Sequence, residues 1–171
     1  AGLTSALANT AVGRIVLASG TYYLTAELSV TRSVVLEAAV AGSVVLHAQA
    51  SSLSPRRVLN INPGSSGVVQ VIRLNITGGH TGGVAYGDGG GVYVSSGTVT
   101  ITSSSIYGNS ANYGGGVAVV GGTVSIVNSQ IYSNTAINSG QTVYSGGGTA
   151  VCFWPTTLTD GVNGIVSTCP A

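Results

Sequence analysis

Three side chains capable of acid–base chemistry lie around the glycine-rich stretch 78–90. Arg73 precedes this stretch, and His80 and Asp88 lie within it. An imidazole or a carboxylate can exchange a proton with a substrate, and a guanidinium can hold an anionic group beside them. One histidine and one aspartate in a loop are also a common coincidence, and Asp88 suits the cap of a glycine turn. We therefore treat these three residues as candidates and assign no catalytic residue.

The remaining acidic residues are far apart in the sequence. They are Glu27, Glu37 and Asp160, and neither Asp88 nor Asp160 has another carboxylate within several residues. Folding can still bring distant residues together. Convergence of two or more of these acids, or of an acid with Arg73, in one groove would favour catalysis.

The sequence contains no recognisable metal-ligand pattern. Its two cysteines, Cys152 and Cys169, form no Cys-x-x-Cys pair, and neither His47 nor His80 is near them. We expect no metal and no cofactor. Two cysteines near a terminus, in a composition typical of secreted β proteins, predict a disulfide that pins a C-terminal cap over residues 152–171. The alternative is two free, buried thiols in a cytosolic protein.

A short internal repeat must position all of these residues. The segment 89–111 reads GGGVYVSSGTVTITSSSIYGNSA, and 25 residues later 114–136 reads GGGVAVVGGTVSIVNSQIYSNTA. A repeat of this length is typical of a solenoid, in which each unit is one coil stacked on the next. Apolar and polar residues alternate within each copy, which predicts short strands. The size of the coil indicates an all-β fold, a single-stranded right-handed parallel β-helix with three strands per coil.

The repeat also predicts the register and the extent of the domain. We expect equivalent inward side chains to stack: Val99 on Val124, Ile101 on Ile126, and Ile106 on Ile131. A weaker copy begins at Gly67, so the extra residues 78–90 form a lateral loop. A second loop is expected at 137–145, before the coil restarts at Gly146. Residues 1–171 would then form one domain of about six to seven coils.

Two parts of the chain resemble known β-helix families. The segments Ile106-Tyr107-Gly108-Asn109 and Ile131-Tyr132-Ser133-Asn134 resemble the repeat of polymorphic outer-membrane-type proteins, with Ile in place of the usual Phe. The upstream coils, from 15–22 through 74–79, resemble the opening of pectin-lyase-like β-helices. The resemblance implies the fold, but these families include lyases, hydrolases, epimerases, adhesins and surface-layer proteins, so it leaves the function open.

The repeated coils present polar and aromatic side chains that could make contacts. Thr and Ser form an outward patch at Thr98, Thr100, Thr123 and Ser125. Regular Thr ladders can bind ice, but Thr also suits exposed strand positions. Tyr107 and Tyr132 form a second pair, which could be a sugar-stacking or assembly surface or a simple packing contact between coils.

Two asparagine positions have distinct interpretations. Asn109 and Asn134 are predicted to stack as a ladder, with amides that bond to each other and to the turn backbone. Asn75 begins the one Asn-x-Ser/Thr tripeptide and is a candidate glycosylation site.

Composition limits the classes of function. Charged residues make up 5% of the chain and the net charge is +1, which gives no field to attract nucleic acid. No apolar run approaches the roughly 18 residues of a membrane-spanning helix. We predict a non-catalytic extracellular or cell-surface protein, structural or adhesive, that associates with itself into an oligomer, filament or surface layer. The alternatives are a pectin-lyase-like carbohydrate-active enzyme or a glycan-binding module, and, less favoured, an ice-binding protein.

Overall fold

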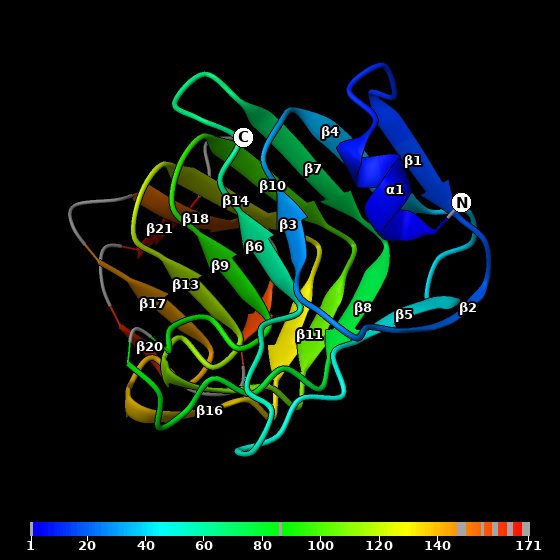
Figure 1. Cartoon of the computed structure of the whole chain (residues 1–171). Helices are drawn as coiled ribbons and strands as arrows, with labels where there is room; N and C mark the ends of the chain where they lie inside the picture. The colour runs from blue at the N-terminus through cyan, green and yellow to red at the C-terminus, as the bar shows by residue number, and fades with distance from the viewer. Residues whose placement is uncertain are drawn as a thin grey trace.

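The chain winds into a parallel β-solenoid with three sheets along its length (Figure 1). The computed structural model describes residues 2–85, 87–146, 150–154, 156–158, 161–163 and 166–168. Every strand pairing between the named strands is parallel, because each coil runs in the same direction as the one before it. The predicted fold class is therefore confirmed.

Each sheet takes one strand from each coil. Sheet A contains β1 (Arg14–Leu17), β4 (Val34–Ala38), β7 (Val68–Ile72), β10 (Thr98–Thr102), β14 (Thr123–Val127), β18 (Ala150–Trp154) and β21 (Val166–Thr168). Sheet B contains β2 (Gly20–Tyr23), β5 (Val44–His47), β8 (Leu74–Thr77), β11 (Ser105–Tyr107), β15 (Gln130–Tyr132) and β19 (Thr157–Leu158). Sheet C contains β3 (Leu28–Val30), β6 (Leu59–Ile61), β9 (Val92–Val94), β13 (Val117–Val119), β17 (Val143–Ser145) and β20 (Val162–Asn163).

The number of turns is slightly smaller than predicted. Six stacked strands in sheets B and C, as far as the chain is described, correspond to about five turns between the first and the last. The sequence predicted six to seven coils. The upstream coils are longer than the 25-residue unit, because they carry lateral loops, so the same chain makes fewer turns.

The core is a continuous column of stacked aliphatic side chains. Val99 pairs with Val124, Ile101 with Ile126, and Ile106 with Ile131, as the repeat predicted. All six side chains are fully buried. Complete burial of one such side chain contributes about 1.5–3 kcal/mol, so these columns are the main stabilising term of the fold.

The repeated glycines are required where coils stack most closely. A Cβ on Gly91 would lie 2.6 Å from the Gly116 oxygen and 2.8 Å from Cγ2 of Ile106. A Cβ on Gly116 would lie 2.6 Å from the Thr142 oxygen and 2.8 Å from Cγ2 of Ile131. Both distances are shorter than carbon contacts in a packed interior. The glycine repeat therefore records the close approach of neighbouring backbones.

Two coils contain a fourth strand, where the sequence predicted three. β12 (Ser110–Tyr113) pairs in parallel with β16 (Thr135–Ser139), and a bulge follows Ala111. Residues 137–145 were predicted to be a lateral loop, and this is wrong, because they contain the end of β16 and the whole of β17. The bulge adds one residue to this coil, so Val143 rather than a later residue takes the place of Val117.

A short helix that the strand pattern did not predict covers the first coil. It is α1 (Leu3–Ala8), which contacts β3 and buries Leu7 against the core (Figure 1). Arg32 donates from Nε to the Leu7 oxygen (2.8 Å) and from Nη2 to the Ala6 oxygen (3.1 Å). A charged donor at the carbonyl end of a helix also suits the helix dipole. Arg32 therefore fastens the helix to the solenoid.

Candidate functional site

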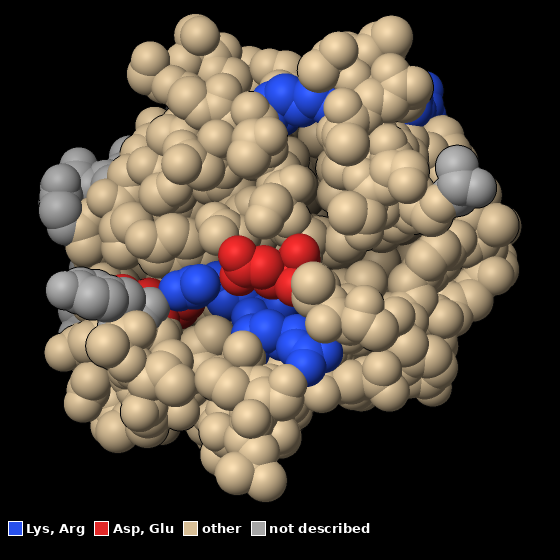
Figure 2. All heavy atoms as spheres, viewed as in Figure 1, with Lys and Arg blue, Asp and Glu red and all other residues tan. Residues whose placement is uncertain are grey.

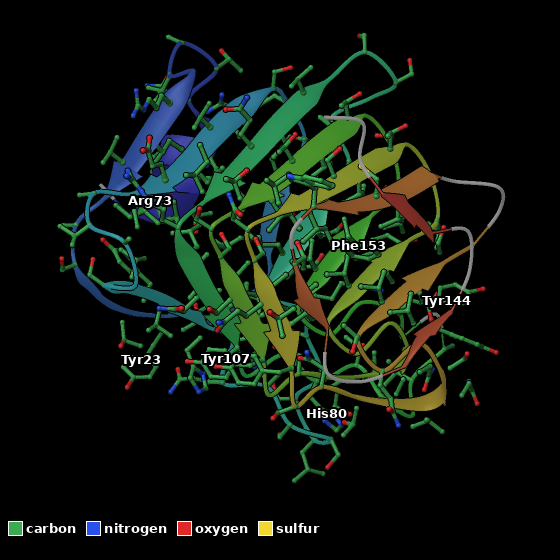
Figure 3. All side chains as sticks on the ribbon, turned by 180° about the vertical axis from the view of Figure 1, so that it is seen from behind. Tyr23, Arg73, His80, Tyr107, Tyr144 and Phe153 are labelled. Carbon is green, nitrogen blue, oxygen red and sulfur yellow. The ribbon has the colours of Figure 1, made fainter. Side chains whose placement is uncertain are left out.

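The three candidate catalytic residues do not form one cluster. The Arg73 guanidinium pairs with the Glu37 carboxylate, which also pairs with Arg14. Glu37 lies on the outer face of sheet A but is almost completely buried beneath the two arginines. Figure 3 shows Arg73 at one corner of the solenoid and His80 at a distant edge. Arg73 thus neutralises a carboxylate of sheet A, away from the loop 78–90.

His80 connects two lateral loops through its backbone. Its amide and carbonyl form a two-way bridge with Arg56, with both N–O distances at 2.9 Å. Residues 48–58 and 78–90 leave the solenoid between strands of consecutive coils, and this bridge holds them side by side. The position of His80 is therefore explained by its backbone bonds, without a role for the imidazole.

A second group of charges converges beside these loops. Glu27 Oε2 lies 3.5 Å from Nη1 of Arg57, and Oε1 accepts a hydrogen bond from Asn60 Nδ2 at 2.9 Å. Arg57 Nε donates to the Asp88 backbone oxygen at 2.6 Å. The Arg57 guanidinium also lies over the ring of Tyr93, 4.6 Å from its centroid, in cation–π geometry. Arg57 therefore links three consecutive coils.

These residues border a hollow of ≈ 270 Å³. The two loops supply most of its walls, and Glu27 reaches it from the turn before β3. Its lining includes Glu27, Pro55, Arg57, Thr81, Val84 and Ala85. Figure 2 shows acidic and basic side chains gathered in this depression, on an otherwise weakly charged face. Within the described part of the chain, this is where opposite charges and a cavity coincide.

The environment of Asp88 disfavours its charged form. Burial raises the pKa of Asp88 above its ordinary value, and the positive charge of Arg57 partly counteracts this increase. Proximity to Arg57 would be expected to lower a carboxyl pKa, so desolvation is the larger effect here. The partial burial follows from the loop, which is folded against the next coil through a bridge between Asp88 and Tyr113.

The sequence did not identify Arg57 and Asn60 as members of a site. Glu27, Arg57 and Asp88 are 30 and 31 residues apart, which is close to the 31-residue register between Leu28 and Leu59 in sheet C. A search for charges that recur at the local coil length would therefore have found them. The prediction used the later 25-residue unit, which does not apply to these coils.

The predicted Thr and Ser patch lies on the open outer face of sheet A. Thr98 pairs with Thr123, and Thr100 pairs with Ser125. On one side the ladder continues with Val68 and Gln70, and on the other with Ala150 and Cys152. Regular hydroxyls are thus restricted to β10 and β14, which is a short array for recognition of a crystal lattice.

The predicted tyrosine pair belongs to a longer row on sheet B. The rings of Tyr107 and Tyr132 stack with centroids 5.2 Å apart and an angle of 7°. The same row runs back through Thr77 and His47 to Tyr23, whose ring lies 5.7 Å from that of His47. Each ring of the stacked pair covers a face of the other, so that face is closed to a sugar ring. The arrangement favours packing between coils.

Asn109 and Asn134 form a ladder inside the turn. Asn109 Nδ2 and its backbone N–H each donate to Oδ1 of Asn134, both at 3.1 Å. Asn109 Oδ1 accepts from the Gly79 amide at 2.9 Å, and Asn134 Nδ2 donates to the Ile106 oxygen at 3.0 Å. Both side chains are buried. The ladder satisfies backbone groups that the turn would otherwise leave unpaired.

Other predicted sites remain predictions. Asn75 Nδ2 donates to the Gly42 oxygen at 3.0 Å, and a glycan on this nitrogen would compete with that bond. Cys152 lies in β18, but Cys169 falls outside the described residues, as does Asp160. The disulfide is therefore not tested, and most of the proposed cap 152–171 is described only as short strands.

The described residues contain no group of three or more His, Cys, Asp or Glu side chains placed to hold a metal ion. They also contain no helix with the length and apolarity needed to cross a membrane. No family model, curated protein or solved structure matches the chain.

Proposed function

We propose that this chain is a non-catalytic structural or adhesive β-solenoid that acts at a cell surface or outside the cell. The observation that carries the proposal is the open face of sheet A. Seven described strands are stacked there in register, and their outward side chains are mainly Thr, Ser, Val and Ile. The charged side chains on this face, Arg14, Glu37 and Arg73, form one mutually paired cluster.

Such a face is suited to contact with another copy of the chain. Its strands are about 4.8 Å apart, so the outward rows form a regular, nearly uncharged surface. Val16 and Val68 on this face are 53% and 48% exposed, which leaves apolar surface for burial. Low net charge reduces the repulsion between copies. The proposal is therefore self-association through sheet A into oligomers or filaments.

The test compares the particle size of two charge variants. Thr123→Arg places a charge on the exposed face of sheet A, and Gln130→Arg places the same charge on the exposed face of sheet B. Sedimentation velocity and electron microscopy should show oligomers or fibres for the parent protein and for Gln130→Arg, and smaller particles for Thr123→Arg. A parent protein that stays monomeric at high concentration would refute self-association.

A carbohydrate-active enzyme related to pectin-lyase-like β-helices is the second candidate. It is favoured by the convergence of Glu27 and Asp88 around Arg57, since cleavage of a uronate polymer needs acids together with a basic group. Against it, the Glu27 and Glu37 carboxylates are both engaged with arginines. Incubation with pectate and alginate, followed by measurement of unsaturated products and reducing ends, distinguishes the two. Product formation that is lost in Glu27→Gln would support the enzyme.

A further inference from the structure

The hollow between the two lateral loops contains a carboxylate that is not fully used. Within the described residues, Glu27 Oε1 accepts a hydrogen bond from Asn60, whereas Oε2 faces Arg57 at 3.5 Å. That separation exceeds a normal hydrogen bond, so Oε2 keeps capacity to accept one. The Glu27 side chain is 31% exposed and lines the hollow, so a ligand can reach it.

The charges of the hollow restrict the kind of ligand. A cation near Glu27 would also meet the guanidinium of Arg57, and an anion near Arg57 would also meet the carboxylate of Glu27. A neutral molecule with two neighbouring hydroxyls avoids both penalties. One hydroxyl can donate to Glu27 Oε2, and the oxygen of its neighbour lies within reach of the Arg57 N–H groups, in a charge-assisted arrangement.

The remaining walls suit the carbon skeleton of such a molecule. Pro55, Val84 and Ala85 supply apolar surface opposite the polar groups. The volume, ≈ 270 Å³, is slightly below the range of roughly 300–1,000 Å³ for drug-sized ligands. The hollow thus accommodates one sugar ring rather than a long oligomer. The lining is held by the Arg56–His80 bridge and by the bond from Arg57 to Asp88, so the site exists before ligand arrives.

We propose that this hollow binds a neutral saccharide unit through a vicinal pair of hydroxyls, with Glu27 as acceptor and Arg57 as donor. The site lies on a different part of the molecule from the outer face of sheet A. It therefore goes beyond the proposed self-association and can fail or succeed independently of it. If both hold, an assembled array would display many copies of a weak sugar site, and the copies would act together.

The experiment is an NMR titration of the isotope-labelled chain with D-mannose, D-galactose and D-glucuronate separately. A ligand of this size should bind with a Kd of about 1 mM or weaker. We expect at least one neutral sugar to shift the amides of residues 55–57 and 81–85 and the Arg57 Nε signal, and D-glucuronate to bind several-fold more weakly. Glu27→Gln should weaken binding by about tenfold or more, because a charged acceptor is lost.

Two further variants separate binding from folding. Glu37→Gln removes a carboxylate that also pairs with arginine, but on sheet A, and should leave sugar binding unchanged. Arg57→Lys keeps the charge but loses the planar donor, and should weaken binding several-fold while thermal unfolding confirms that the chain is folded. Absence of saturable shifts with both neutral sugars would overturn the proposal. So would tighter binding of D-glucuronate, or shifts confined to the row from Tyr107 to Tyr132.

Discussion

Replacement of Asn109 by alanine should cost about 4 kcal/mol of folding free energy. The Asn109 side chain is buried and takes part in four hydrogen bonds. Nδ2 donates to the Ile76 oxygen (3.2 Å) and the Tyr107 oxygen (3.0 Å), in addition to its bond with Asn134. Each such bond contributes about 1 kcal/mol net, and a buried partner left unpaired costs at least as much. Gly79 would lose the acceptor of its amide.

The assay is urea unfolding followed by circular dichroism, with Asn138→Ala as the control. Asn138 is exposed in β16, so its replacement should change the free energy by less than about 0.5 kcal/mol. Asn109→Ala and Asn134→Ala should also be non-additive by about 0.5–3 kcal/mol, because they share two bonds. Equal stabilities of Asn109→Ala and Asn138→Ala would show that the ladder contributes nothing beyond its shape.

Three further outcomes follow from individual contacts. Gly116→Ala should destabilise the fold by about 2–4 kcal/mol, whereas Gly13→Ala, where a Cβ meets open space, should cost little; thermal unfolding of the pair checks this. Burial raises the Asp88 pKa, so the folded chain binds this proton more tightly than the unfolded chain and stability should fall as pH rises through that pKa; Asp88→Asn should flatten this part of the stability–pH curve. Arg32→Gln should loosen α1, which faster amide exchange at Leu7 would report, and unchanged exchange would contradict the role assigned to Arg32.

The sequence predicted the solenoid well because its period converts directly into contact. Residues one coil apart must stack, so the pairing of Ile101 with Ile126 and the Asn109–Asn134 ladder follow from a single number, the 25-residue spacing. The extra strand pair β12–β16 was missed for a related reason. Segments such as Ser110–Tyr113 have little intrinsic strand preference, and they become strands because an equivalent backbone lies on the next coil.

The candidate site was harder to predict because it is formed where the period changes. The sheet C register is 31 residues between Leu28 and Leu59 but 25 between Val92 and Val117, since the lateral loops lengthen the upstream coils. The analysis of charges by sequence proximity grouped Arg73 with Asp88, whereas the fold placed Arg73 with Glu37.

The two kinds of surface on this molecule have different physical requirements. A repeated coil repeats its side chains, so the face built by β10 and β14 can present only what each unit supplies, and charges there would lie about 4.8 Å from their copies and repel. Opposite charges can be combined only where consecutive coils differ. Glu27, Arg57 and Asp88 come from three coils that share no repeated motif, and the loops 48–58 and 78–90 shield them from bulk water. The irregular half of the solenoid is therefore where a small ligand can be recognised, and the regular half is where an extended contact can be made.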